Sequence, residues 1–171
     1  FARGLDAAGE REWNLRLGTA DRWLLRGHGT DGLGRYLLTG IAFRETPSSR
    51  YGYVASIDDR GRLRWLYGAT SWHLFGAVRP TGDGQWTAVG ARRRFVTDET
   101  WLYDTALMGL SDAGARLWDV QHRLGEESQG WGLAPHPQGG WYATGFTTPD
   151  RTRYEVDLLR VDDRGQLDDT R

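Results

Sequence analysis

The chain has 171 residues, 39% of them hydrophobic, and a formal net charge of −1, so its overall charge gives no reason to expect binding to nucleic acid or to an anionic membrane. It contains no cysteine, which excludes disulfides, thiolate nucleophiles and cysteine-rich zinc sites. All 22 basic residues are arginine, which excludes Schiff-base and phosphate-loop chemistry based on lysine, and no apolar run approaches the roughly 18 residues of a membrane-spanning helix.

The elements predicted along the chain are short β-strands, because apolar residues come in short runs between glycines and no stretch has a helical period. The chain opens on two strands at 1–5 and 10–17. Two four-stranded units follow over 23–67 and 72–122, and the last unit ends in a polar, truncated strand at 166–171.

The strands of each unit follow one plan. An inner strand such as 73–78 is joined by a glycine-rich turn to an aromatic-led strand such as 141–144, and a long polar loop leads to a third strand such as 103–110. A tight turn of the type Asp-Asp-Arg-Gly then leads to the fourth strand, because aspartate bonds its own backbone and glycine tolerates a positive φ.

Two sequence blocks recur in phase along nearly the whole chain, which predicts a repeat of about 50 residues. The first block ends each time in a glycine: Gly40, Gly90 and Gly145. The second block also carries a glycine in each copy: Gly9, Gly61, Gly114 and Gly165. Four residues after the first three of these glycines stands a tryptophan, and the fourth copy has an aspartate there: Trp13, Trp65, Trp118 and Asp169.

Four-stranded units at this period are typical of a β-propeller, whose sheets stack face to face around an axis because one sheet cannot bury both of its faces. We therefore expect an all-β fold: a single, partial β-propeller domain over 1–171, with about three and a half antiparallel four-stranded blades. Its expected parts are a half blade over 1–17 and blades over 18–67, 68–123 and 124–171. Closed propellers have about four to eight blades, so the remaining blades are expected from a longer chain or from homo-oligomerisation.

The order of these blocks resembles the repeats of secreted bacterial β-propeller proteins of the SBBP type and, more loosely, quinoprotein propeller repeats. The matching residues are Tyr67-Gly68, Asp83-Gly84, Gly90, Asp104, Leu107, Leu110, Asp112, Gly114 and Trp118. The resemblance implies a secreted, periplasmic or cell-envelope bacterial protein, and it implies little about activity because this fold hosts many functions. The stretch 5–9 lacks the threonine of the quinoprotein motif and Asn14 is the only asparagine, so we expect no cofactor.

The long loops that join second to third strands, at 41–51, 91–101 and 146–155, differ between copies, and binding residues usually lie on such loops. The candidate binding residues are Arg44, Arg50, Arg92, Arg93, Arg94, Trp101, Arg151 and Arg153. The arginine run 92–94 has two interpretations. It is an anion or carboxylate clamp, because guanidinium groups bond such partners in pairs, or a solvated loop paired locally with Asp98 and Glu99.

A second group of candidates is expected at the rim of the propeller channel: Trp23, Trp72, His73, Glu127 and Trp131. The tryptophans, placed near the start of each inner strand, either stack on a sugar or another flat ligand or pack between blades. No metal site is expected, because the four histidines form no pair with ligand spacing and the acidic doublets fall mainly in hairpin turns.

The leading hypothesis is a non-enzymatic binding module whose loop face recognises a protein or a carbohydrate, because the loops are divergent and polar and no catalytic motif is found. We expect neither nucleic acid as a partner nor insertion into a membrane. One alternative is a propeller enzyme, a hydrolase, lyase or quinoprotein, with residues pooled around the channel mouth; another is a structural scaffold. The enzyme is favoured if His73, Arg93 and an acid such as Glu127 converge.

Overall fold

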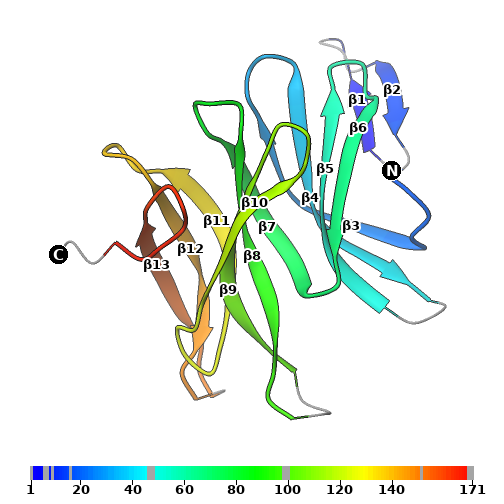
Figure 1. Cartoon of the computed structure of the whole chain (residues 1–171). Helices are drawn as coiled ribbons and strands as arrows, with labels where there is room; N and C mark the ends of the chain where they lie inside the picture. The colour runs from blue at the N-terminus through cyan, green and yellow to red at the C-terminus, as the bar shows by residue number, and fades with distance from the viewer. Residues whose placement is uncertain are drawn as a thin grey trace.

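The computed structural model describes residues 2–5, 8, 10–15, 17–45, 49–97, 101–150 and 152–168. The regular elements of this part of the chain are all β-strands, and neighbouring strands pair antiparallel (Figure 1). None of these residues belongs to a helix long and apolar enough to cross a membrane. The prediction of an all-β fold made of antiparallel sheets is therefore confirmed.

The strands form successive sheets along the chain. The N-terminal hairpin pairs β1 (Ala2–Leu5) with β2 (Arg11–Leu15). The first full sheet contains, in spatial order, β3 (Arg22–Thr30), β4 (Arg35–Arg44), β5 (Ser49–Asp58) and β6 (Leu63–Ala69). The second full sheet contains β7 (Trp72–Pro80), β8 (Trp86–Phe95), β9 (Trp101–Leu110) and β10 (Arg116–His122). The C-terminal sheet contains β11 (Glu127–Pro135), β12 (Trp141–Thr148) and β13 (Glu155–Val161).

The second strand of each sheet is longer than the sequence predicted. β4 continues to Arg44, β8 to Phe95 and β12 to Thr148. Arg44 and the arginine run 92–94 therefore lie on strands rather than in loops, which corrects the predicted loop boundaries. The prediction ended each strand with its apolar run, whereas strand pairing continues into the charged residues.

The sheets stack in chain order through their first strands. β7 packs against β3, β4 and β5, and β11 packs against β7, β8 and β9 (Figure 1). The first seam is the contact between the first and second full sheets, and it buries Val54 and Phe75 among others. The second seam is the contact between the second full sheet and the C-terminal sheet, and it buries Leu107 and Trp141.

The first repeated glycine stands opposite a β-bulge in the first strand of its sheet, at Gly40, Gly90 and Gly145. In β7 the pairing register shifts between Phe75 and Ala77, and a Cβ on Gly90 would collide with the carbonyl oxygen of Leu74. The bulge brings the two backbones so close that only glycine fits.

Residues of the second repeated block form a contact between neighbouring sheets as well as a hairpin turn. Each tryptophan lies against the turn glycine of the next sheet: Trp13 against Gly61, Trp65 against Gly114, and Trp118 against Gly165. The three glycines have φ values of 72°, 80° and 74°, which L side chains rarely adopt, and an added Cβ would meet the indole ring. The hairpin turns were predicted correctly from the sequence; the indole above each turn was not foreseen.

Candidate functional site

The first seam opens into a cleft at the end where β4 connects to β5 and β8 connects to β9. The cleft has a volume of about 620 Å³ and is lined by Arg22, Phe43, Arg44, Glu45, Ser49, Arg50, Thr70, Arg93, Trp101 and Tyr103. Both full sheets contribute to it. The structure thus brings together four of the residues predicted for the loop face: Arg44, Arg50, Arg93 and Trp101.

Cross-strand pairing explains why the lining residues of each sheet are neighbours. In the first full sheet, Arg22 pairs with Phe43 and Phe43 pairs with Arg50. In the second full sheet, Arg93 pairs with Tyr103. Side chains directly opposite on antiparallel strands share a face of the sheet, so each sheet presents one group of lining residues. The sequence signalled neither Arg22 nor Tyr103, because their role depends on this pairing.

Two hydrogen bonds orient two of the arginines. Arg93 Nη2 donates to the backbone carbonyl oxygen of Arg50 at 2.9 Å, which joins the two sheets. Arg50 Nη2 donates to the hydroxyl oxygen of Tyr103, also at 2.9 Å. Each guanidinium carries about five N–H donors, so both groups keep most of their donors for another partner.

Aromatic rings support the cations of the cleft. The guanidinium carbon of Arg22 lies 5.3 Å from the ring centroid of Phe43, and that of Arg93 lies 5.3 Å from the ring of Trp101. Phe95 packs on Trp101 with 3.8 Å between ring centroids. Such contacts attract a cation to a ring without neutralising its charge.

Within the described part of the chain, the arginines of the cleft form no ion pairs. Among the described residues no carboxylate forms an ion pair with Arg22, Arg44, Arg50 or Arg93. Glu45 is the acidic residue of the lining, and its carboxylate also forms no ion pair within that part of the chain. The cleft therefore carries an excess of positive charge.

His73 lies against the cleft lining, and the positive charge of the cleft affects its pKa. Its ring packs on Tyr103 with 4.2 Å between centroids, and its Nδ1 is buried without a hydrogen-bond partner in the described structure. Burial, followed by the positive charges of Arg50, Arg93 and Arg26, lowers the pKa of His73 from 6.5 to about 4. Burial also lowers the pKa of Arg93, and the charge of Arg50 lowers it further while Tyr103 acts in the opposite direction.

The two neighbours of Arg93 on β8 are neutralised. Side chains alternate along a strand, so Arg92 and Arg94 lie on the face opposite to Arg93. Arg92 Nη1 lies 2.7 Å from Asp119 Oδ2, and Arg94 Nε lies 2.9 Å from Asp104 Oδ2. Asp104 is only 2% exposed, so this second pair is held deep in the sheet.

The arginine run is therefore not one unit, which corrects both interpretations given to it. It is neither a three-residue clamp nor a solvated loop, because only Arg93 lines the cleft. Its proposed partners Asp98 and Glu99 lie outside the described residues, as does the candidate Arg151. Arg153 lies 3.2 Å from Glu155 in an exposed ion pair.

The structure separates the residues predicted for the channel rim. Trp72 is 1% exposed and belongs to the core of the first seam, which agrees with the packing interpretation given for it and not with stacking on a ligand. Trp23 packs on Tyr53 with 4.9 Å between ring centroids, next to the N-terminal hairpin. Trp131 lies within the bulge of β11, 37% exposed, with the guanidinium carbon of Arg26 5.4 Å from its ring. Trp23 and Trp72 each pair with the residue two places after the repeated glycine, whereas Trp131 lies in a bulge, so only Trp131 differs in register.

His73 and Arg93 come together as the enzyme hypothesis required, but Glu127 is engaged elsewhere. Its Oε1 accepts a hydrogen bond from Gln129 Nε2 at 3.2 Å. Among the described residues no group of three or more acidic or histidine side chains could hold a metal ion. The turn carboxylates of Asp58 and Asp162 accept backbone N–H groups within their own turns.

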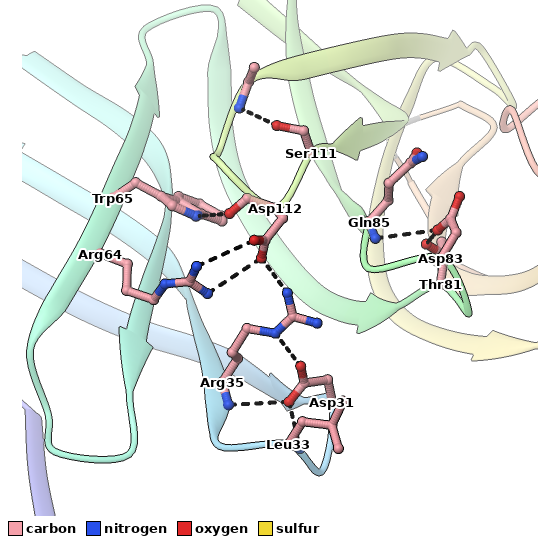
Figure 2. A network of polar contacts seen from close by, with 11 residues as sticks. Asp31, Leu33, Arg35, Arg64, Trp65, Thr81, Asp83, Gln85, Ser111 and Asp112 are labelled. Carbon is pink, nitrogen blue, oxygen red and sulfur yellow. Dashed lines mark hydrogen bonds and ion pairs between the residues drawn. The ribbon is translucent and has the colours of Figure 1, made fainter.

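The opposite end of the first seam shows how arginines are paired elsewhere in this protein (Figure 2). Arg35 bonds Asp31 in its own turn and Asp112 in the second full sheet. Arg64 lies 3.3 Å from Asp112, and Trp65 Nε1 donates to the carbonyl oxygen of Asp112 at 2.7 Å. One seam is thus compensated at the turn end and positive at the cleft end.

A smaller cavity of about 480 Å³ lies at the turn end of the second seam, lined in part by Asp83, Trp86 and Asp163. Its carboxylates already accept hydrogen bonds from backbone N–H groups: Asp83 from Gln85, and Asp163 from Gly140 at 2.8 Å. The cleft of the first seam is therefore the stronger candidate for a ligand site.

Comparison with protein-family models gives no match for this chain, and no curated protein matches it significantly.

Proposed function

We propose that the sheets are blades of a β-propeller. Three repeating features support the proposal. β7 and β11 each pack on the sheet before them, and β3, β7 and β11 each carry a bulge. The Trp65 and Trp118 rings reach the turn of the next sheet. A ring of blades needs one such contact repeated from sheet to sheet.

The exposed face of the C-terminal sheet supports a further blade. Val156 and Leu158 on β13 are 89% and 66% exposed. Leu158 occupies the register position that Val54 and Leu107 hold in the full sheets, where both are fully buried by the following sheet. We infer that a blade from a longer chain or from a second copy covers β13, since an apolar face of this kind favours association.

The molar mass in solution, measured by light scattering after size exclusion, tests this architecture. A stable dimer indicates that a second copy covers β13, and aggregation of the isolated chain indicates that blades of a longer chain are missing. A stable monomer that does not associate would contradict the inference.

We propose that the protein is a non-enzymatic binding module, secreted or in the cell envelope as the repeat resemblance implies, and that its ligand binds in the cleft of the first seam. The observation that carries this proposal is a group of four guanidinium groups in one cleft, none of which forms an ion pair with a carboxylate of the described residues. Like charges gathered without partners repel one another, and a ligand that supplies negative charge or hydrogen-bond acceptors removes that cost. The catalytic alternative needs an acid beside His73 and Arg93; Glu127 bonds Gln129, so Glu45 of the lining is the acid that this alternative would have to use.

Array binding tests the proposed function. The wild-type chain is applied to glycan and peptide arrays beside the double variant Arg50→Gln/Arg93→Gln. The matched control is Arg60→Gln/Arg164→Gln, which removes the same charge from two exposed positions in the turns. We expect the wild type and the control to retain the same ligands and the cleft variant to lose them. Equal binding by all three proteins would contradict a ligand site in the cleft.

A further inference from the structure

The ligand of the cleft must supply negative charge. Arg50 and Arg93 are already oriented by hydrogen bonds to Tyr103 and to the Arg50 carbonyl, so their free N–H groups need not be ordered by the ligand. No described carboxylate pairs with them. Guanidinium groups bond carboxylates and sulfates through two parallel hydrogen bonds, which makes an oxyanion the natural partner.

The aromatic rings of the cleft are already in contact with other side chains. Arg22 lies over Phe43, Arg93 lies over Trp101, and the ring of Tyr103 packs on His73. A site for single-stranded nucleic acid instead offers open ring faces on which successive bases stack. The rings here support guanidinium groups, so this arrangement favours a ligand read through its anionic groups rather than through flat bases.

The cleft also offers hydrogen-bond acceptors. The carboxylate of Glu45 has no ion-pair partner among the described residues, and Ser49 and Thr70 add hydroxyl groups to the lining. Glu45 would repel a ligand that carries only carboxylates, such as an acidic peptide. A ligand with hydroxyl donors beside its anionic groups satisfies both Glu45 and the arginines. Sugars that carry carboxylate or sulfate groups have this combination.

The size of the cleft limits the length of the ligand. Its volume of about 620 Å³ lies within the range of about 300–1,000 Å³ that is usual for small-ligand sites. A few sugar rings fit such a site.

We propose that the cleft binds an acidic oligosaccharide, with the carboxylate or sulfate groups held by Arg50 and Arg93 and the sugar hydroxyls held by Glu45, Ser49 and Thr70. This inference rests on the proposed function, because it names the ligand class of the same cleft.

Isothermal titration calorimetry on the full chain tests the ligand class. The probes are trigalacturonate, its methyl ester, a sulfated disaccharide, triglutamate and a short oligothymidylate. We expect binding of the acidic sugars and a loss of about tenfold in affinity when Arg93 is changed to Gln, because one charge-assisted interaction is removed. Esterification of the carboxylates removes the interactions of both Arg50 and Arg93, so we expect a larger loss, of about a hundredfold. The source of the anion is read from the relative affinity of the uronate and the sulfated sugar. Arg60→Gln/Arg164→Gln leaves these affinities unchanged.

The variant Glu45→Gln sharpens the distinction between ligand classes. It removes the repulsion toward carboxylates and weakens the acceptor for hydroxyl groups, so we expect weaker binding of trigalacturonate and stronger binding of triglutamate. Wild-type chain that binds triglutamate or oligothymidylate more tightly than the acidic sugars, in an Arg93-dependent manner, overturns the sugar inference and leaves the proposed function standing. Absence of Arg93-dependent binding to any probe also overturns it, and the arrays then decide the proposed function separately.

Discussion

Two adjacent arginines of β8 lie in different surroundings: Arg93 lines the cleft, and Arg94 belongs to a cluster with Asp104 and Gln121, called here the Asp104 cluster. The two sites differ in whether a carboxylate neutralises the arginine. In the Asp104 cluster, Arg94 lies 2.9 Å from Asp104, and Gln121 Nε2 donates to the same carboxylate at 2.7 Å. Arg94 also donates to the carbonyl oxygen of Glu126 at 2.6 Å, just before β11. In the cleft, Arg93 has an aromatic ring and a carbonyl oxygen as partners, and no carboxylate of the described chain. The first arrangement stabilises the fold, and the second leaves charge available.

One register position accounts for much of this difference. Arg94 stands four residues after Gly90, as Arg44 stands four residues after Gly40. Asp104, the partner of Arg94, pairs with Arg92 across β8 and β9, and Tyr51 holds the corresponding position in the first full sheet. Where one repeat has an acid, the other therefore has an aromatic ring, and Arg44 has no carboxylate partner in the described part of the chain.

The largest effect is expected from Asp104→Ala. The change removes a carboxylate that is 2% exposed and leaves Arg94 and Gln121 without their acceptor, so we expect a loss of about 3 kcal/mol in the free energy of unfolding. Urea unfolding followed by tryptophan fluorescence measures it. Asp119→Ala is the control, since its partners Arg92 and Arg116 are more exposed and the expected loss is below about 1 kcal/mol. Equal losses in the two variants would remove the distinction drawn for the Asp104 cluster.

Acidification is expected to lower the free energy of unfolding through protonation of His73, which lies beside the cleft. The pKa of His73 is lowered to about 4 in the folded protein, from 6.5 in the ordinary case, so the unfolded chain binds the proton more readily. The free energy of unfolding is therefore highest above pH 6.5 and falls as the pH drops from 6.5 toward 4, by at most about 1.4 kcal/mol per pH unit, and by less because the ring is partly solvated.

Urea unfolding at a series of pH values, compared between the wild type and His73→Gln, measures this contribution. A slope between pH 6.5 and 4 that is identical in both proteins would show that His73 does not carry it. A bound anion reduces the positive potential at His73, so the slope should become shallower when the cleft is occupied.

Tyr51→Asp transfers the acid of the Asp104 cluster to the first full sheet. The new carboxylate is placed to pair with Arg44 and to lower the positive charge of the cleft, so we expect acidic ligands to bind about fivefold more weakly, a difference of about 1 kcal/mol. Tyr51→Asn is the matched control, because it loses the same contact with Trp23 without adding charge. If both variants weaken binding equally, the effect comes from the lost aromatic contact and not from the charge.

The smallest effect on stability is expected from Arg93→Gln. Arg93 gains no carboxylate partner from the described chain and lies near the positive charge of Arg50, so its loss should change the free energy of unfolding by no more than about 0.5 kcal/mol. Arg94→Gln, one residue away, should cost about 2 kcal/mol because it strands the buried Asp104. Thermal unfolding of the two variants compares adjacent positions on the same strand, and a cost at Arg93 equal to that at Arg94 would be contrary to the comparison.

The repeat could be predicted from the sequence because residues close together in the chain determine its turns. Turns of the type at Asp58–Gly61 are recognisable from aspartate and glycine alone, and the period of the glycines predicted the two four-stranded sheets. The described part of the C-terminal sheet has three strands, and the truncated fourth strand predicted there is reduced to one bridge between Val161 and Leu167. Strand ends were less predictable. Charged residues such as Arg44 and Arg93 continue the pairing of β4 and β8 beyond the apolar runs that marked the strands.

The site itself was only partly predictable. A run of three arginines has the same residue at every position, so no alternation shows which side chain faces which side of the sheet. The partner of Arg94 stands ten residues away on another strand, and that of Arg92 stands 27 residues away. Such partners are set by strand register rather than by spacing. The prediction aligned Trp131 with Trp72, but Trp131 lies in the bulge of β11, where β7 has Gly76, and Ser128 holds the register position of Trp72.

The contact of each tryptophan with the turn glycine of the next sheet has a consequence for synthesis on the ribosome. The indole of Trp13 meets Gly61 and that of Trp65 meets Gly114, so each ring finds its place only after roughly 50 further residues have been translated. A newly synthesised sheet therefore exposes its tryptophan ring until the next sheet has been translated. Assembly should proceed from the amino end with a lag of one repeat, and a pause in translation within a repeat should lengthen the exposure of the preceding indole.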